Sequence, residues 1–441
     1  MKQHVYIETY GCQMNINDSE VVASILYDAG FDYTTNINEA NLILLNTCSI
    51  REHAENRVFQ RLHDIKKIKK NNDSVLVGVI GCMAERLRDQ LFNHAIQTDI
   101  VAGPDSYRNL PELVSDAQSH KQAIHVKLSR TETYKEIVPY RIDESHISTF
   151  ISIMRGCNNF CTYCIVPYTR GRERSRDVQS ILNEVQDVVK KGYKEITLLG
   201  QNVNSYNYDD NGIRILFPDL LRRVAEIVPD TRIRFSTSHP KDMHDDLLYV
   251  MAEYDNVCKW VHLPVQSGSS SVLKRMGRTY DREWYMQRVA AIRNIVPEAS
   301  ITSDIISGFC GETEEEHQET VSLMKEVGFD LSYMFKYSER PGTIAARDFR
   351  DDVPEDVKRK RLNEIIHLQK KISAEQYKKD EGKEFLVLVE GVSKKSDEEL
   401  KGRNSQNKTI IFPCGNAHIG DYVMVRIIKS NSATLKGVIV G

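Results

Sequence analysis

Residues 155–167 read RGCNNFCTYCIVP and bring three cysteines, Cys157, Cys161 and Cys164, into one short segment. The spacing C-x3-C-x2-C lets a single tight loop present three thiolates to one metal centre. Thiolates hold iron–sulfur clusters, and a four-iron cluster with only three protein thiolates keeps one iron free for a substrate or cofactor. The alternative is a structural zinc site, which needs four protein ligands. No fourth Cys or His follows at a matching spacing, so the segment favours the open cluster.

Length and composition set broad limits on the protein. The chain has 441 residues, enough for two or three domains, and is 41% hydrophobic and 27% charged, as is usual for globular proteins. No apolar run approaches the roughly 18 residues of a membrane span, and the first residues are strand-like rather than signal-like. We therefore expect a cytoplasmic protein without a membrane segment. In that reducing compartment its nine cysteines are more often ligands than disulfides.

The first 118 residues alternate strand and helix patterns. The sequence predicts strands at residues 5–10, 42–45, 75–80 and 98–103, and helices at about 18–29, at 51–70, after 84 and after 109. Repeated β–α units of this length are typical of a parallel sheet covered on both faces. We expect an N-terminal doubly wound parallel-sheet α/β domain over residues 1–118, followed by a linker over 119–142.

Three further cysteines follow three of these strands. Cys12, Cys48 and Cys82 each stand between the end of a predicted strand and the start of a helix. Ligands of open parallel sheets gather at the carboxyl ends of the strands, and a helix N-terminus favours the thiolate. One cysteine in such a place is unremarkable, but three in the same topological position predict a second three-thiolate cluster with one free iron.

The central segment, residues 143–375, resumes the β–α alternation with longer units. Strands are expected near residues 150–154, 194–202, 232–239, 260–268, 301–309 and 331–340. Six βα steps predict a partial TIM-like barrel with its chemistry at the carboxyl ends of the strands, since a full eight-step barrel does not fit the available residues.

The last segment, residues 376–441, changes to short alternating strands at 385–390, 409–413, 422–428 and 435–440. This pattern predicts a small antiparallel β-barrel of five strands, a type of fold that binds nucleic acids. The polar, positive stretch 400–408 is interpreted as a phosphate-facing loop, with a plain hairpin loop as the alternative.

The whole arrangement resembles the radical S-adenosylmethionine (SAM) methylthiotransferases. Two three-cysteine sets, an N-terminal α/β domain, a six-step barrel and a small terminal barrel match that family over essentially the full chain. The stretches TYGCQMN (9–15), NTCSIR (46–51) and HLPVQSGS (262–269) resemble its bacterial branch that modifies isopentenylated adenosine in tRNA. The terminal barrel resembles a TRAM domain, an RNA-binding module.

The resemblance implies methylthiolation of adenine C2 in N6-isopentenyladenosine next to the tRNA anticodon. It implies two 4Fe-4S clusters and S-adenosyl-L-methionine as cofactors. The cluster on Cys157, Cys161 and Cys164 would generate a 5′-deoxyadenosyl radical that abstracts hydrogen from C2. The auxiliary cluster would take part in sulfur and methyl transfer, and its ligands would be Cys12, Cys48 and Cys82. Expected partners are tRNA, an electron donor such as a flavodoxin or ferredoxin, and a sulfur-supplying system.

Individual cofactor contacts are expected at the mouth of the barrel, where packing or turn roles are the alternative. The expected contacts are Tyr163, Gly200, Gln201, Ser236, Gln266 and Asp304. Arg340 could pair with a carboxylate or phosphate, or simply stand in a surface turn. Cys310 stands where the family pattern more often has proline, and we interpret it as a small apolar substitute. Cys258 and Cys414 are expected to be structural.

Three other functions stay open at this point. The first is a methylthiotransferase acting on threonylcarbamoyl-adenosine or on a ribosomal-protein residue. The second is a non-catalytic iron–sulfur RNA-binding sensor, which would not cleave SAM. The third is a zinc-stapled RNA-binding protein, which would give a colourless preparation.

Overall fold

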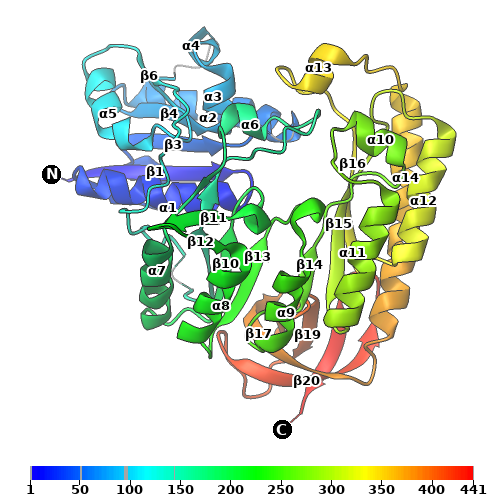
Figure 1. The fold of residues 1–441 in the computed structure, drawn as a ribbon. Coiled ribbons are helices and arrows are strands. Elements are labelled where there is room, and N and C mark those ends of the chain that lie inside the picture. Colours follow the sequence, from blue (N-terminus) through cyan, green and yellow to red (C-terminus); the bar gives the residue numbers. More distant parts are fainter. Residues whose placement is uncertain (1, 50–51, 94–97, 144, 441) are drawn as a thin grey trace.

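The computed structural model describes residues 2–49, 52–93, 98–143 and 145–440. It contains an N-terminal α/β body, a central open barrel and a small closed barrel (Figure 1). The closed barrel lies below the central strands in this view, whereas α6 (Val166–Thr169) and α13 (Ile344–Asp348) lie above them. Within the described residues no helix is long and apolar enough to cross a membrane.

The N-terminal body is a parallel sheet of six strands in the order β2-β1-β3-β4-β5-β6. Its strands are β1 (Gln3–Tyr10), β2 (Phe31–Tyr33), β3 (Leu42–Thr47), β4 (Leu76–Gly81), β5 (Ile100–Ala102) and β6 (Ala123–His125). Strands β3 and β4 are buried along their whole length, as expected for central strands covered on both faces. The doubly wound sheet and its four predicted strands are therefore confirmed. The short edge strands β2 and β6 are additions that the sequence did not indicate.

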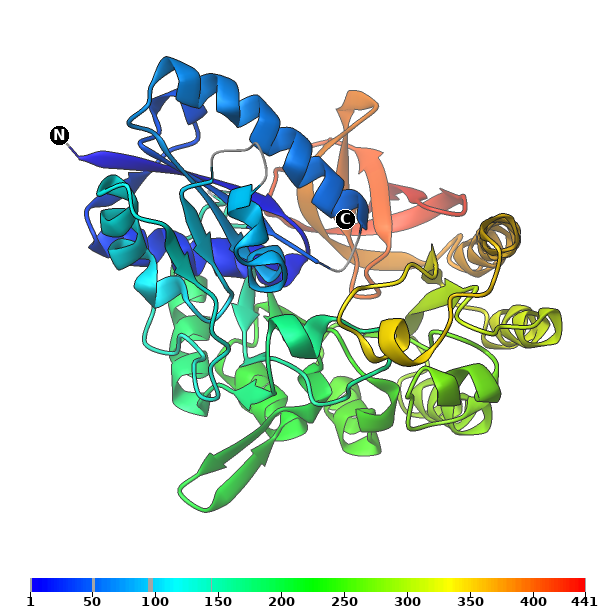
Figure 2. The same cartoon turned by 90° about the horizontal axis from the view of Figure 1, so that it is seen from above.

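Helices cover both faces of this sheet. Apolar side chains of α1 (Gln13–Asp28) and α5 (Leu110–Gln118) pack on one face, and those of α2 (Glu52–Asn71), α3 (Cys82–Leu87) and α4 (Gln90–Asn93) on the other. The long helix α2 crosses the outer side of the sheet in Figure 2. Helix α1 starts five residues before the expected Asp18, because Cys12 caps it. The expected start of α2 at Arg51 lies outside the described residues.

The central segment contains the six predicted parallel strands. They are β7 (Ser148–Ser152), β10 (Glu195–Leu199), β13 (Arg232–Ser236), β14 (Trp260–His262), β15 (Ser300–Ser307) and β16 (Leu331–Lys336). They form two three-stranded sheets, β13-β10-β7 and β14-β15-β16, and an isolated bridge between Ile233 and Val257 connects the first sheet to the chain leading into β14. The prediction of a partial TIM-like barrel is confirmed.

Helices surround the outside of the open barrel (Figure 2). They are α7 (Val178–Lys190), α8 (Phe217–Ile227), α9 (Asp245–Glu253), α10 (Ser270–Arg275), α11 (Arg282–Ile295), α12 (Glu314–Val327) and α14 (Glu355–Lys378). Two hairpin pairings were not expected from the sequence: β8 (Met154–Arg155) with β9 (Arg174–Ser175), and β11 (Asn207–Asp210) with β12 (Ile213–Leu216). The second hairpin projects from the barrel in Figure 2.

The C-terminal segment is a closed barrel of five strands in the order β17-β18-β19-β21-β20. The strands are β17 (Glu384–Ser393), β18 (Ser396–Arg403), β19 (Thr409–Pro413), β20 (Tyr422–Ser430) and β21 (Leu435–Ile439). The predicted small barrel is confirmed, although β19 and β21 pair in parallel while the other pairs are antiparallel.

The interpretation of residues 400–408 as a phosphate-facing loop is wrong. The first four of them belong to β18, and the rest form a turn that contacts the amino-terminal end of the central strands. Arg234 Nη2 donates to the carbonyl of Asn404 at 2.7 Å, and Arg403 Nη2 contacts Glu195 Oε1 at 3.1 Å. Lys408 pairs with Asp330 and Asp380. Arg403 and Lys408 therefore help to attach the small barrel to the open barrel.

The domain boundaries proposed from the sequence stay predictions. Strand β6 lies inside the stretch 119–142 that was expected to be a linker, and it pairs with β5. Helix α14 continues across the expected boundary at residues 375 and 376.

Candidate active site

Cys12, Cys48 and Cys82 lie at the carboxyl ends of β1, β3 and β4, three neighbouring strands of the N-terminal sheet. From β1 the chain goes outward to β2 and then crosses to β3, so β1 and β3 flank the point where the strand order reverses. Ligands of doubly wound sheets bind at this switch point. The structure therefore brings the three predicted thiols to the same edge of the sheet.

Glycines beside these cysteines allow the strand ends to approach closely. A Cβ atom on Gly11 would stand only 2.9 Å from Cys48 Cβ, and one on Gly81 only 2.7 Å from the Thr47 carbonyl oxygen. Gly81 also has a φ of +91°, which side chains rarely adopt. This cysteine site therefore requires glycine directly before Cys12 and directly before Cys82.

The environments of the three N-terminal thiols differ. Cys48 and Cys82 are buried, whereas Cys12 is exposed. A hydrogen bond with Cys48 is the main cause that lowers the pKa of Cys12 to about 6, and the positive charge of Arg170 also lowers it. Burial raises the pKa of the Cys82 thiol, and Arg170 offsets part of that rise. The site therefore favours at least one thiolate at neutral pH.

The second triad, Cys157, Cys161 and Cys164, occupies the loop that follows β8. Thr162 fixes this loop, because its N–H donates to the Met276 carbonyl at 2.9 Å and its carbonyl accepts from Ala345 N at 2.7 Å. Burial raises the pKa of the Cys157 thiol and, with the charge of Cys161, raises that of Cys164 to about 12. Cys157 and Cys164 therefore resist ionisation in the metal-free loop, and metal binding converts such thiols to thiolates.

A buried ion-pair network joins the segments that carry the two triads. Asp18 Oδ1 on α1 contacts Arg155 Nη1 at 2.7 Å, and Asp18 Oδ2 contacts Arg170 Nη2 at 2.9 Å. Burial alone would raise the pKa of Asp18, but the two guanidinium charges outweigh it and hold that pKa below its ordinary value. Arg155 comes just before the Cys157 loop and Arg170 shortly after it, so one carboxylate of the N-terminal body fixes both ends of this loop.

The donor set fits two iron–sulfur clusters better than zinc. Among the described residues no group of three His, Cys, Asp or Glu side chains is close enough to hold a single metal ion. A four-iron cluster has different needs, since its three thiolates bind three separate irons. Arg170 Nη1 is buried and has no hydrogen-bond partner among these residues. Such an orphaned donor costs about 1–3 kcal/mol or more unless a group absent from the chain satisfies it.

Most of the expected cofactor-binding positions lie at or beyond the carboxyl ends of the central strands. Gly200 and Gln201 follow β10, Ser236 ends β13, Gln266 follows β14, and Asp304 lies on β15. The N–H of Gln266 donates to the Asp304 carbonyl at 2.9 Å, which places these two residues side by side. Gln201 Oε1 is buried and has no partner among the described residues. Their contact with a cofactor stays a prediction.

Tyr163 and the other candidate residues do not gather at one site. Tyr163 is beside Cys161 and Cys164, and its ring packs edge-on against Phe309. Cys310 is buried in the same apolar cluster. Arg340 is in a turn, where its carbonyl accepts from the Thr343 hydroxyl at 2.8 Å. Cys258 is buried near Arg234, and Cys414 is in the small barrel.

Several residues at the site gave no signal in the sequence. Arg278 Nη1 lies 3.4 Å from Cys161 Sγ, although 117 positions separate the two residues. His239 packs against the Tyr280 ring, and burial followed by the charge of Arg278 lowers its pKa well below the ordinary value. A contact between residues so far apart in the chain leaves no local sequence pattern, so only the fold reveals it.

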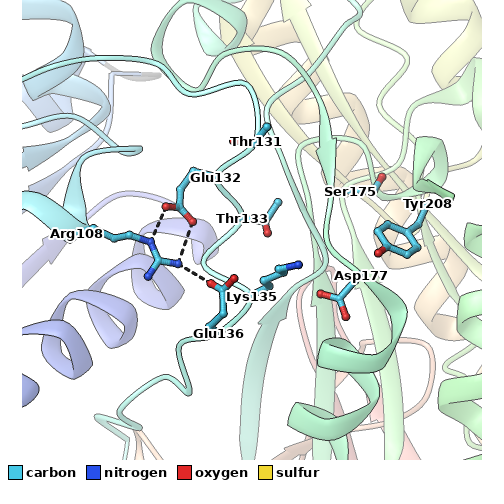
Figure 3. Close-up of a pocket in the computed structure, with 9 residues that line it drawn as sticks. All are labelled: Arg108, Thr131, Glu132, Thr133, Lys135, Glu136, Ser175, Asp177 and Tyr208. Atoms are coloured by element: carbon cyan, nitrogen blue, oxygen red, sulfur yellow. Dashed lines mark hydrogen bonds and ion pairs between the residues drawn. The ribbon is translucent and has the colours of Figure 1, made fainter. Parts of the chain in front are cut away.

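The structure also has a surface groove of about 620 Å³, whose lining residues are drawn in Figure 3. Its wall includes Arg108, which contacts Glu132 at 2.6 Å and Glu136 at 2.7 Å. None of the cysteines or expected cofactor contacts lines it. The groove therefore contains none of the residues that the sequence marked as site candidates.

Comparison with known proteins agrees with this division of the chain. Residues 4–103 match the model described as uncharacterized protein family UPF0004, residues 151–324 the radical SAM superfamily, and residues 378–440 the TRAM domain. In fold, the chain is similar to TsrM, a radical SAM methyltransferase from Kitasatospora setae solved with cobalamin and a [4Fe-4S] cluster bound. That TM-score is 0.60 at 15% identity, over 78% of this chain and 77% of TsrM. The fold and site thus define a radical SAM enzyme.

Curated relatives identify the family within this class. The tRNA-2-methylthio-N(6)-dimethylallyladenosine synthase of Phocaeicola vulgatus is 60% identical over 98% of this chain and 95% of the relative. Those of Bacteroides thetaiotaomicron and Porphyromonas gingivalis strain W83 are 58% and 54% identical, over 98% and 100% of this chain and 95% of each relative. The chain belongs to the tRNA-2-methylthio-N(6)-dimethylallyladenosine synthase family. The threonylcarbamoyl-adenosine, ribosomal-protein and sensor alternatives are not favoured.

Proposed function

We propose that this protein methylthiolates C2 of N6-isopentenyladenosine next to the anticodon of tRNA. The observation that carries the proposal is the presence of two three-cysteine sets, one at the carboxyl edge of the N-terminal parallel sheet and one in the loop after β8, on segments that are joined through Asp18. One site alone would suffice to cleave SAM. Two sites held in a fixed relation suit a reaction in which one activates a carbon and the other delivers a sulfur to it.

Cys157, Cys161 and Cys164 would hold an open 4Fe-4S cluster, which would supply the electron that cleaves SAM to methionine and a 5′-deoxyadenosyl radical. A second open cluster on Cys12, Cys48 and Cys82 supplies a site for the sulfur and methyl group. Adenine C2 is an unactivated C–H carbon, which neither a general base nor an ordinary methyl donor can functionalise. Radical chemistry beside a sulfur site resolves this difficulty.

The residues of the chain position these groups. Gly200, Gln201, Ser236, Gln266 and Asp304 surround the barrel mouth and provide carbonyl, amide, hydroxyl and carboxylate groups for SAM. The buried, unpartnered Gln201 Oε1 is free to accept a hydrogen bond from it. The side chain of Tyr163 forms one wall beside the cysteine loop. Partial burial of these residues limits the access of water to a reactive radical.

The small barrel supplies the RNA-binding part of the proposal. Its outer face exposes Leu386 and Met424, paired across β17 and β20, while its turn 404–408 is used for docking. The exposed face of such a barrel is available for nucleic-acid contacts. Because the reaction consumes electrons and sulfur, a donor such as a flavodoxin or ferredoxin and a sulfur-supplying system complete the scheme in the cytoplasm.

The experiment is anaerobic turnover of the reconstituted protein with SAM and a reductant. Three substrates are compared in parallel: an anticodon stem-loop with N6-isopentenyladenosine, one with threonylcarbamoyl-adenosine, and a ribosomal-protein peptide. The proposal predicts 5′-deoxyadenosine together with a nucleoside heavier by one S–CH2 unit from the first substrate alone. 5′-Deoxyadenosine with a product from another substrate would mean that the target is wrong. A cluster-loaded protein that forms neither would favour a non-catalytic sensor.

A further inference from the structure

Arg170 occupies an unusual place between the two cysteine sites. It follows α6, which begins two residues after Cys164, and α6 packs against α3, which begins at Cys82. The guanidinium of Arg170 is therefore carried by the central barrel but reaches into the N-terminal body. It is only 3% exposed.

The two ends of this guanidinium have different surroundings. Nη2 is satisfied by Asp18 Oδ2 at 2.9 Å. Nη1 is buried and meets no acceptor among the described residues. Burial by itself would lower the pKa of Arg170, but nearby acidic groups outweigh burial and raise it. These groups are Asp18, the thiols of Cys82 and Cys12, and Tyr107. An unpartnered N–H of a charged side chain is thus buried in the neighbourhood of the Cys82 and Cys12 thiols, where the auxiliary cluster would lie.

We propose that Arg170 is a positioning residue that donates a charge-assisted hydrogen bond from Nη1 to the auxiliary cluster or its Cys82 thiolate. The inference rests on the proposed function, since it requires a cluster on Cys12, Cys48 and Cys82. Hydrogen bonds to cluster sulfurs and nearby charges tune the reduction potential and hold the cluster in place. A positive charge stabilises the reduced cluster, which carries one more negative charge, and so raises its potential.

Arg155 offers a matched control. Arg155 is 2% exposed, and its Nη1 contacts the other carboxylate oxygen of Asp18, Oδ1, at 2.7 Å. Its charge acts on Asp18, Arg170, Tyr134 and Asp105, and no thiol is among the groups that set its pKa. A change that only weakens the ion-pair network affects both arginines alike, whereas a cluster contact belongs to Arg170 alone.

The test uses the full chain with Cys157, Cys161 and Cys164 replaced by Ala, so that only the auxiliary cluster forms. Into this background are placed Arg170→Gln, Arg170→Lys or Arg155→Gln. Iron and sulfide content are measured, and the midpoint potential is followed by EPR-monitored redox titration. Arg170→Gln is expected to shift the reduction equilibrium at least tenfold towards the oxidised cluster, about 59 mV for a one-electron couple. Arg170→Lys keeps the positive charge and should shift the midpoint potential less. Arg155→Gln should leave the midpoint potential near that of the parent protein.

The outcomes separate this inference from the function on which it rests. If the parent triple variant binds no cluster, the proposed auxiliary site itself fails. If the cluster forms and Arg170→Gln has the potential of the parent or of Arg155→Gln, the role of Arg170 is overturned. Loss of iron from Arg170→Gln but not from Arg155→Gln would support the role, because it would show that this donor retains the cluster.

Discussion

Replacing Asp18 by Asn tests whether the ion-pair network holds the two cysteine-bearing bodies together. Asp18 is fully buried and contacts Arg155 and Arg170 across the boundary between α1 and the central barrel. The Asp18→Asn variant keeps the shape of the side chain but removes the carboxylate that pairs with Arg170, and it leaves Arg155 with only the more distant Asp105, 3.8 Å from its Nε. Breaking a buried ion pair in this way costs about 3–5 kcal/mol.

The assay is native-state hydrogen exchange of amides in α1 and β7, which report local separation of the two bodies. At 1.36 kcal/mol per tenfold change, 3–5 kcal/mol corresponds to exchange that is faster by roughly two to nearly four powers of ten. The control is Glu253→Gln, which removes an ion pair to Arg222 whose side chains are 52% and 43% exposed. An exposed pair contributes about 0–1 kcal/mol, so exchange should rise no more than about fivefold. An Asp18→Asn variant that behaves like this control would refute the reasoning.

Three further predictions use other parts of the structure. Cys157→Ala should abolish 5′-deoxyadenosine formation in the reconstituted enzyme, and retained formation measured by chromatography would exclude this thiol as a cluster ligand. In iron-free protein at pH 7, Cys12 with a pKa of about 6 should be alkylated much faster than Cys164 with a pKa of about 12, and equal labelling by mass spectrometry would contradict the assigned environments. Burial opposes ionisation of Glu195, but the charges of Arg234, Arg403 and Arg232 outweigh burial and lower its pKa. The stability that ionised Glu195 contributes is therefore complete above its unfolded pKa of about 4.3. It is lost as the pH falls through the lower pKa of the folded state. Glu195→Gln should therefore lower hydrogen-exchange protection of the small barrel at pH 7 by about 3–5 kcal/mol and remove this acid sensitivity; an unchanged pH profile would argue against it.

The sequence was sufficient for the parts of the fold that depend on local pattern. The buried runs of β3 and β4 and the position of each cysteine between a strand and a helix led to the right sheet and the right edge. The edge strands β2 and β6 have three residues each, too few for a recognisable alternation. The predicted start of helix α1 was too late, because cysteine is an uncommon residue at a helix N-cap. The capping by Cys12 involves Asn15, whose side-chain oxygen accepts a hydrogen bond from the Cys12 N–H at 3.3 Å.

Long-range electrostatics accounts for most of what the sequence did not reveal. Asp18 and Arg155 are 137 positions apart, and nothing local marks them as partners. The basic stretch 400–408 was assigned to phosphate because its carboxylate partner, Glu195, lies 208 positions from Arg403. Charge in a sequence indicates a need for a counter-charge, but only the fold shows whether that partner is RNA or the protein itself.

The most direct test of the two-site account is a comparison of native protein with Cys48→Ala in one anaerobic turnover. Each reaction contains SAM, a reductant and isopentenylated tRNA, and both 5′-deoxyadenosine and methylthiolated nucleoside are quantified from the same sample. The account predicts that Cys48→Ala still forms 5′-deoxyadenosine but yields no methylthiolated nucleoside, because only the sulfur site is damaged. Methylthiolated nucleoside from the Cys48→Ala protein would contradict the central claim that two separate thiol sites carry the reaction.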